Sequence, residues 1–278
     1  MTSLRLGELL LDRPAVMGIL NVTPDSFSDG GEFVDPTDAI RHAERMAEQG
    51  AAIIDIGGES TRPGAEAVSE QQEIDRVIPV IEAVTAAVEV PVSVDTSKPA
   101  VMRAAVASGA SMINDVRALR EDGALEAAAG LNTPVCLMHM QGEPRTMQHD
   151  PRYGDVVAEV TQFLSDRVAE CIEAGIGKDL LLVDPGLGFG KAPHDNVELL
   201  ANLRQLDQIG LPVLVGISRK STLGAITGRD VDQRLPASLA AAVMAVERGA
   251  SIIRAHDVAE TVDALKVVRA VTDMEDDK

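Results

Sequence analysis

The segment GAAIID, from Gly50 to Asp55, recurs with small changes at two other places in the chain. GASMIN begins at Gly109, and GASIIR begins at Gly249. Each copy follows an amphipathic run, so its glycine is typical of the left-handed residue that ends a helix. The apolar residues after the glycine are typical of a short buried strand. The segment therefore predicts a repeated joint at which a helix ends and a buried strand begins.

A second joint places proline before a short run rich in strand-forming residues. VPVSVD begins at Val90, TPVCLMH at Thr133 and LPVLVG at Leu211. The proline stops the preceding segment and opens an extended one. The apolar runs AVMGILN at Ala15 and DLLLVDPG at Asp179 bring the number of predicted strands to eight.

Helical patterns separate nearly all of these eight strands. Short apolar strands joined by helices form buried parallel sheets, and eight such units in one chain favour a closed (β/α)8 TIM barrel, an α/β fold. We expect a single domain over residues 1–278, ending in a loose acidic tail at 271–278. A doubly wound open sheet is the alternative.

Composition excludes several classes of function. The 278 residues are 45% hydrophobic and carry a net charge of -19, which argues against nucleic-acid and anionic-membrane partners. No apolar run approaches the ~20 residues that span a bilayer, and the N-terminus lacks a secretory signal pattern. Cys136 and Cys171 have no metal-ligand spacing. We expect them to be free, buried thiols in a protein of the reducing cytoplasm.

Polar side chains stand at nearly every predicted strand end. In a barrel the active site is built at the carboxyl ends of the strands. This pattern predicts a polar ring, and buried carboxylates in it need cations, metals or hydrogen-bond donors. The ring comprises Asn21, Asp55, Asp95, Asn114 with Asp115, Met138 with His139, Asp184, Ser218 to Lys220, and Arg254 with His256.

Two parts of this ring predict ligand chemistry. Asp95 or Asp184 can accept two N–H bonds from an amino-pyrimidine edge. Arg254 and His256 lie two residues apart, so both point to the same side of their strand. In a barrel that strand closes against the first, so we expect Asn21 to converge with them on a phosphate or diphosphate. Asn21 would then offer an oxygen to a Mg²⁺ ion held mainly by the diphosphate.

Three glycine-containing loops follow strand ends. DPGLGFGKA, Asp184 to Ala192, lacks P-loop spacing, so we interpret its glycines as allowing backbone to approach a ligand. Its Phe189, and Phe27 in NVTPDSFSDGG, are two of only four phenylalanines and could each stack on a flat substrate. Phe27 could equally anchor its own loop. The third loop is GGESTRPGA, from Gly57 to Ala65.

These motifs together resemble the bacterial dihydropteroate synthase family. The resemblance runs from about Val16 to Val258 and rests on several motifs in the correct order. They are NVTPDSFSDGG, IGGESTRPGA, SVDTSK, IND, LMHMQG, DPGLGFGK, GISRKS and RAHDV.

The resemblance implies a cytoplasmic, homodimeric TIM-barrel enzyme of folate biosynthesis. Such an enzyme condenses 6-hydroxymethyl-7,8-dihydropterin diphosphate with 4-aminobenzoate to give 7,8-dihydropteroate and diphosphate, with Mg²⁺ as cofactor. Both substrates are small molecules, and sulfonamides compete for the aminobenzoate pocket.

The resemblance also implies roles for individual residues. Asp95, Asn114, Met138, Asp184 and Lys220 would hold the pterin, and Asn21 would bind Mg²⁺. The diphosphate would contact Arg62, Arg254 and His256. The aminobenzoate pocket would be formed by Phe27, Thr61, Pro63, Phe189, Lys220 and Ser221. The catalytic residues would be Asp95, Lys220, Arg254 and His256.

Two other functions are compatible with a pterin site. A methyltetrahydrofolate-dependent methyltransferase domain shares the barrel, but it has no need of the basic pair Arg254 and His256. A catalytically silent paralogue would bind pterin alone. Product formation separates both from the synthase.

Overall fold

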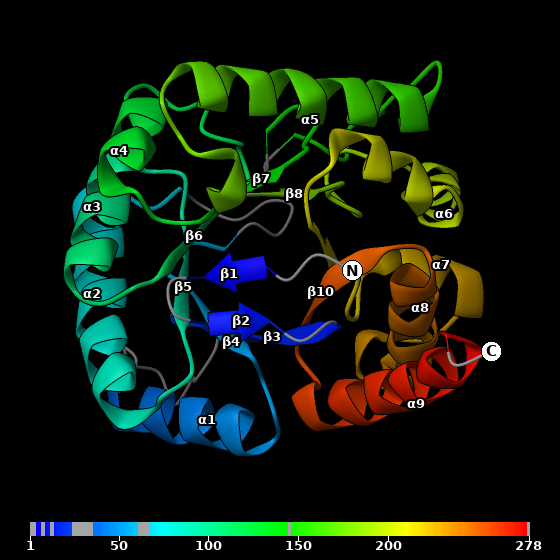
Figure 1. The fold of residues 1–278 in the computed structure, drawn as a ribbon, viewed down its shortest axis with the longest axis horizontal. Coiled ribbons are helices and arrows are strands. Elements are labelled where there is room, and N and C mark those ends of the chain that lie inside the picture. The colour runs from blue at the N-terminus through cyan, green and yellow to red at the C-terminus, as the bar shows by residue number, and fades with distance from the viewer. Residues whose placement is uncertain are drawn as a thin grey trace.

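Eight parallel strands close into a barrel in the computed structural model of the chain (Figure 1). The structure describes residues 4–6, 9–11, 14–23, 36–60, 67–143 and 146–276. The last strand pairs with the first, which confirms the predicted (β/α)8 barrel and excludes the open sheet. The strands are β3 (Ala15–Asn21), β4 (Ile53–Gly57), β5 (Val92–Asp95), β6 (Met112–Asp115), β7 (Val135–Met138), β8 (Leu181–Asp184), β9 (Val213–Gly216) and β10 (Ala250–Ala255).

Helices connect successive strands and form the outer layer that surrounds the barrel in Figure 1. β9 and β10 are joined by two helices, and the last helix follows β10. The helices are α1 (Pro36–Glu48), α2 (Glu70–Ala87), α3 (Pro99–Ala107), α4 (Ala124–Leu131), α5 (Val156–Glu173), α6 (Pro193–Ala201), α7 (Ser221–Thr227), α8 (Leu235–Glu247) and α9 (Val258–Asp276).

The repeated glycine joints work as predicted. Gly50, Gly109 and Gly249 have φ angles of 93°, 107° and 102°, in the left-handed region that glycine adopts most easily. Gly50 N–H bonds to the carbonyl of Ala47, and Ala51 N–H bonds to that of Met46, each at 2.9 Å. This pair of bonds is the Schellman arrangement, which ends α1 and turns the chain directly into β4.

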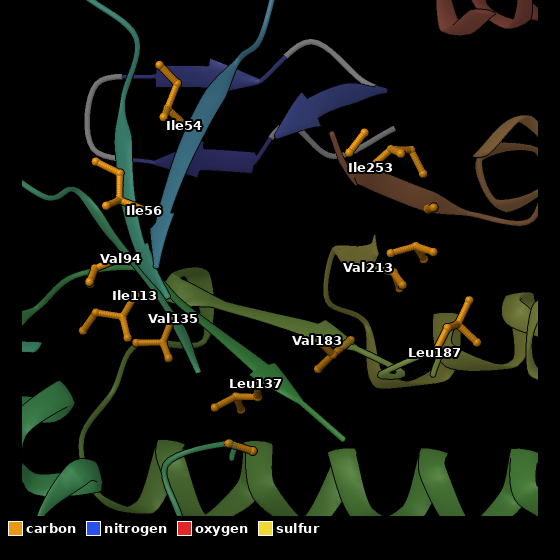
Figure 2. Packing of buried hydrophobic residues seen from close by; sticks show 14 of the residues in the cluster. Ile54, Ile56, Val94, Ile113, Val135, Leu137, Val183, Leu187, Val213 and Ile253 are labelled. Carbon is orange, nitrogen blue, oxygen red and sulfur yellow. The ribbon is translucent and has the colours of Figure 1, made fainter. Parts of the chain in front are cut away.

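Alternate residues of each strand face two different apolar layers. Outward-facing residues pack against the helices, and Figure 2 shows examples such as Ile54, Val94 and Leu137. Inward-facing residues fill the barrel interior near its amino-terminal end. We call this second set the barrel floor. It comprises Ala15, Met17, Ile53, Met112, Cys136, Leu182, Leu214 and Ile252.

A short hairpin precedes the barrel, and the sequence pattern did not predict it. β1 (Leu4–Leu6) and β2 (Leu9–Leu11) pair antiparallel. β1 contacts the 3₁₀ turn at Lys178–Leu180, which leads into β8. The hairpin therefore lies at the amino-terminal end of the barrel, across its middle in Figure 1 and opposite the expected active site.

The carboxyl-terminal end differs from the expected loose tail. α9 continues through the acidic stretch as far as Asp276. No glycine or proline follows Val258, so nothing in the sequence breaks the helix. Thr272 Oγ1 also donates to the carbonyl of Val268, 3.0 Å away and one turn earlier.

Two other expectations concern the cysteines and membrane insertion. Cys136 and Cys171 are both buried and free, as predicted. Among the helices that the structure describes, none combines the length and the apolar character needed to cross a bilayer.

Candidate active site

A polar layer lies above the barrel floor, toward the carboxyl ends of the strands. Side chains two residues apart on a strand point to the same side of the sheet. The residue two positions after a floor residue therefore also points into the barrel, in the next layer. That layer contains two carboxylates, one amide and one guanidinium, over a floor that is apolar. Its members are Ile19, Asp55, Asn114, Met138, Asp184, Gly216 and Arg254.

Asp55, Asp95, Asn114 and Arg254 form one hydrogen-bonded network across this layer. Arg254 Nε donates to Asp55 Oδ2 at 2.6 Å, and its Nη2 donates to Asp95 Oδ2 at 2.8 Å. Asn114 Nδ2 donates to the same oxygen of Asp55 at 3.0 Å. Asp55 is fully buried, and within the described residues its Oδ1 has no hydrogen-bond partner. The network therefore keeps an acceptor oxygen at the bottom of the site.

The two carboxylates predicted to bind a ligand are both poorly solvated. Burial raises the pKa of Asp95 to about 7, and the charge of Asp55 adds to this effect while Arg254 opposes it. Burial also raises the pKa of Asp184, opposed by the charge of Lys220 and by the Gly186 N–H, which donates to its Oδ1 at 2.7 Å. Groups this short of solvent favour a ligand that brings its own N–H donors.

Lys220 lies beside Asp184 at the edge of the same layer. Its Nζ donates to the carbonyl of Leu187 and lies 4.4 Å from the ring centroid of Phe189. Burial lowers the pKa of Lys220 to about 8, although the charge of Asp184 opposes the shift. Lys220 and Phe189 therefore form one cation–π unit at the rim of the site.

The glycines of the loop after β8 serve contacts within the protein. A Cβ on Gly186 would lie 1.9 Å from the carbonyl oxygen of His139, and one on Gly190 would lie 2.3 Å from that of Gln141. The interpretation that these glycines admit a ligand is therefore wrong for both positions. They allow the loop after β8 to pack against the backbone that follows β7.

His256 is held by the loop after β9. Its backbone N–H donates to Ser218 Oγ at 3.2 Å, and its Nδ1 lies 3.0 Å from the same oxygen. Arg219, next to Ser218, forms a two-point ion pair with Asp257. These contacts fix the loops after β9 and β10 to each other. Sequence analysis named Ser218 at a strand end but gave it no role.

Arg254 of the predicted basic corner also bonds to carboxylates of the polar ring. Arg254 is paired with two carboxylates, so its positive charge is balanced within the protein. A guanidinium has five N–H groups, and these two bonds leave others that can donate to an anion. Asn21 pairs with Gly57 of β4, three residues beyond the Gly18–Ala255 pair that joins β3 to β10. Asn21 and Asp95 therefore both pair with Gly57, from the two sides of β4.

Asp95 places a second oxygen near Asn21, the residue predicted to bind Mg²⁺. A Cβ placed on Gly57 would lie 3.7 Å from Asn21 Oδ1 and 3.7 Å from Asp95 Oδ2. Two oxygens thus flank a position that a side chain larger than glycine would occupy. Hard cations such as Mg²⁺ take oxygen ligands, often only one or two from protein.

A cavity of about 300 Å³ opens beside Asp95, among the loops that follow β4, β5 and β6. On one wall Lys98 forms ion pairs with Glu59 and with the buried Glu73. Burial raises the pKa of Glu73, an effect that Lys98 opposes. The cavity lies within the range of small-ligand pockets, ~300–1,000 Å³. It borders the ring at Asp95 but does not include Asp184 or Lys220 among its walls.

The remaining predicted residues are placed as follows. Met138 is buried with Val116, Met140 and Met147 in an apolar wall on which Phe189 packs. Ser221 is exposed at the first position of α7. Four residues lie outside the part of the chain that the structure describes: Phe27, Thr61, Arg62 and Pro63.

Sequence analysis missed one buried cation altogether. Lys191 is 2% exposed and bonds to His139, which had been noted only as a strand-end residue. Because the loop lacks the spacing of a P-loop, the sequence pattern assigned no role to this lysine. The only available signal was its place just after a glycine-rich turn.

Comparisons with known proteins identify the family of this chain. Residues 17–256 match the family described as pterin binding enzyme. The chain is 55% identical over 271 residues to the dihydropteroate synthase of Escherichia coli K12, covering 98% of this chain and 96% of that protein.

Two solved structures are also similar along nearly their whole length. A Yersinia pestis dihydropteroate synthase in complex with a sulfonamide drug superposes with a TM-score of 0.93 at 53% identity, covering 98% of this chain and all of that one. A Xanthomonas albilineans dihydropteroate synthase in complex with 7,8-dihydropteroate gives 0.88 at 52% identity, covering 98% and 99%.

Proposed function

The chain belongs to the pterin-binding enzymes, and among them to the dihydropteroate synthases, and we propose that the residues described above divide the reaction among them as follows. The enzyme joins 6-hydroxymethyl-7,8-dihydropterin diphosphate to 4-aminobenzoate and releases diphosphate. The observation that carries our assignment of residues is the polar layer over an apolar floor.

The pterin would lie on the polar layer. Its amino-pyrimidine edge carries N–H donors, which are what Asp184 and the unpartnered oxygen of Asp55 require. Asn114 and Asp95 add an amide and a second carboxylate, and Met138 supplies the apolar wall against the ring. Lys220 would face the pterin from the side of Asp184.

The diphosphate would lie at the Arg254 side of the pocket. The remaining N–H groups of Arg254, with His256 held by Ser218, would stabilise the charge that develops as the C–O bond breaks. Arg62 would join them according to the family resemblance. Asn21 would hold Mg²⁺ together with the diphosphate, and when bound this ion supplies positive charge to the leaving group.

The second half of the reaction forms a C–N bond. The electron pair of the broken C–O bond leaves with diphosphate, and the methylene carbon becomes cationic and conjugated with the pterin ring. Asp95 would stabilise this cation, and the aminobenzoate nitrogen would attack it and lose a proton. Phe27, Thr61, Pro63, Phe189 and Ser221 would form the aminobenzoate pocket, in which we also expect sulfonamides to compete.

A product assay tests this proposal. Purified protein would be incubated with Mg²⁺, dihydropterin diphosphate and 4-aminobenzoate, and both dihydropteroate and diphosphate would be measured. We expect the two products in equal amounts from the wild type and from Lys266→Ala, an exposed control on α9. Lys220→Ala should lose most of the activity. Diphosphate without dihydropteroate, or pterin binding without either product, would contradict the proposal and favour a silent paralogue.

The methyltransferase alternative is tested in the same preparation. Methyltetrahydrofolate and a cobalamin protein would replace the two substrates, and methylcobalamin would be followed by absorbance. We expect no methyl transfer, because Arg254 and His256 give the site an anion-binding side that a methyl donor does not use.

We also propose that the enzyme is a cytoplasmic homodimer. Three apolar side chains occupy one face of α9 at helical spacing: Val267, Val271 and Met274, which are 65%, 57% and 65% exposed. A second copy of the chain would cover this face. Sedimentation should show a dimer that Val271→Asp dissociates and Ile172→Asp, on α5, does not. A wild-type monomer would contradict this proposal. The two free thiols suit a reducing compartment.

A further inference from the structure

Lys191 lies inside the loop that follows β8 rather than on its surface. Its Nζ lies 2.8 Å from His139 Nδ1, 2.9 Å from the carbonyl oxygen of Gly186 and 3.0 Å from that of Phe189. The carbonyl of His139 is a fourth and more distant neighbour at 3.4 Å. An ammonium group has three N–H donors, so the three short contacts use all of them.

The Nδ1 atom of His139 accepts one of these hydrogen bonds. Burial, together with the charge of Lys191, lowers the pKa of His139 to about 2, so the imidazole is neutral. Its ring packs edge-on against Phe163, with the centroids 4.9 Å apart. With the ring neutral and its Nδ1 facing an ammonium, the proton of His139 resides on Nε2.

Side chains bond to every backbone carbonyl of this loop from Gly186 to Gly190. Lys191 bonds to the first and the fourth carbonyl, and Lys220 bonds to the second. Gln148 Nε2 donates to the third at 2.6 Å, and the Tyr153 hydroxyl donates to the fifth at 2.7 Å. The loop is therefore held by donors from other segments. Lys191 makes two of these five hydrogen bonds, and each of the other donors makes one.

We propose that Lys191 is a positioning residue, whose ammonium fixes the Gly186–Phe189 backbone and so places the Phe189 ring and the Lys220 ammonium for the aminobenzoate. The proposal rests on the proposed synthase function. Lys191 is 2% exposed, so it would not contact either substrate directly. It acts on the pocket through the carbonyls of Gly186 and Phe189 and, through the same backbone, on the carbonyl of Leu187 that Lys220 contacts.

The proposal makes the aminobenzoate affinity depend on the charge of Lys191. Burial lowers the pKa of Lys191 to about 7, and the charges of Asp184 and Asp195 oppose the shift while that of Lys220 adds to it. His139 and Tyr153 also contact this loop, and both stay neutral near pH 7 because burial lowers the pKa of His139 to about 2 and raises the pKa of Tyr153 well above its usual value. Above about pH 7 the Lys191 ammonium loses one of its three N–H donors. One of the three acceptors around it then has no hydrogen bond from Lys191.

The test is steady-state kinetics with Lys191→Met, which keeps an unbranched side chain one atom shorter and removes its donors. We expect the KM for 4-aminobenzoate to rise about tenfold, as the loss of one or two hydrogen bonds allows, with a smaller change for dihydropterin diphosphate. In the wild type this KM should also rise as the pH increases through about 7, and the variant should lack that step. Lys191→Arg should recover part of the affinity.

Two milder variants cover the case in which Lys191→Met does not fold. Gln148→Leu and Tyr153→Phe each remove one donor to the same loop and should shift the aminobenzoate KM in the same direction by a smaller factor. Equal changes for both substrates, or no change in any of these variants, would overturn the positioning role. An inactive wild type would instead overturn the proposed function, so the two failures are distinguishable.

Discussion

Arg254 and Asp55 form an ion pair across the barrel, with Nε 2.6 Å from Oδ2, although 199 positions separate them in the chain. Asp55 is fully buried, and the side chain of Arg254 is 20% exposed. The pair lies at the bottom of the proposed pterin site and joins it to the residues that we assign to the diphosphate. The proposed pterin side and the proposed diphosphate side of the site would therefore share this ion pair.

Replacing Asp55 should destabilise the protein strongly. Removing one partner of a buried ion pair typically costs about 3–5 kcal/mol, and Asp95 would compensate Arg254 only in part. We expect Asp55→Ala to lower the free energy of unfolding by about 3 kcal/mol. Asp263→Asn breaks an exposed pair with Lys266 and should cost less than about 0.5 kcal/mol. Urea unfolding of both variants measures the difference, and similar values would contradict a central role for the pair.

The contribution of Asp95 to stability should fall as the pH rises from about 4 to about 7. The pKa of Asp95 is raised from 3.8 to about 7 in the folded protein, so the folded state holds a proton that the unfolded chain has lost. Its stabilising contribution is complete below the unfolded pKa and is lost as the pH rises through the folded one, a change on the order of a few kcal/mol. Asp184, Asp115 and Glu73 act in the same direction, whereas His139, whose pKa is lowered to about 2, acts in the opposite direction below about pH 6.5.

The contribution of Asp95 can be isolated by substitution. Asp95→Asn cannot ionise, so the slope of its unfolding free energy against pH between about pH 4 and about pH 7 should be more positive than that of the wild type. Urea unfolding at each pH measures both slopes, with Asp263→Asn as the control that keeps the wild-type slope. An unchanged slope in Asp95→Asn would show that Asp95 is ionised throughout this range.

Lys220 should define an alkaline limit of activity. Its pKa is about 8, so its ammonium is lost, together with its interaction with Asp184, as the pH rises through that value. We expect kcat/KM to fall above about pH 8. Lys220→Met should reduce kcat/KM by roughly 10²-fold at pH 7, a loss typical of one electrostatic group in a preorganised site. The residual kcat/KM of the variant should not fall near pH 8. A fall near pH 8 that persists in the variant would show that another residue titrates there.

Two glycine-to-alanine substitutions should have opposite effects. Gly186 has a φ of +65°, and a Cβ there would meet the carbonyl of His139 at 1.9 Å. Gly186→Ala should therefore displace the loop after β8 and impair aminobenzoate binding. Gly130 lies in α4, and a Cβ there meets nothing within 4 Å, so Gly130→Ala should stabilise the protein by up to about 1 kcal/mol. Thermal unfolding and substrate kinetics of both variants check this contrast.

The eight strands could be predicted because their signals are local. Gly50, Gly109 and Gly249 end helices through their own left-handed backbone, and the apolar run that follows each one begins a strand. Hairpin strands β1 and β2, of three residues each, are too short to show such a pattern. The prediction of a loose acidic tail is wrong because a high charge does not by itself prevent a helix. The absence of glycine and proline after Val258 lets the helix continue.

The members of the site were also predictable, but their partners were not. Asp95, Asn114, Asp184 and Arg254 stand at strand ends, and alternation along each strand places them on the inner face. The pairing of Arg254 with Asp55 and Asp95 depends on the stagger of the closed sheet, which the sequence pattern does not contain. The burial of Lys191 depends on contact with His139, 52 residues away.

The sequence by itself thus determined the barrel, the inward faces of its strands and the chemical types gathered at one end. Turn conformation, helix capping and strand alternation depend on neighbours along the chain, which a sequence displays directly. The tertiary structure alone decided which charges neutralise one another and which lysine supports the loop after β8. Coulombic and hydrogen-bond energies depend on separation in space and on exclusion of water, and both are set only when distant segments pack together.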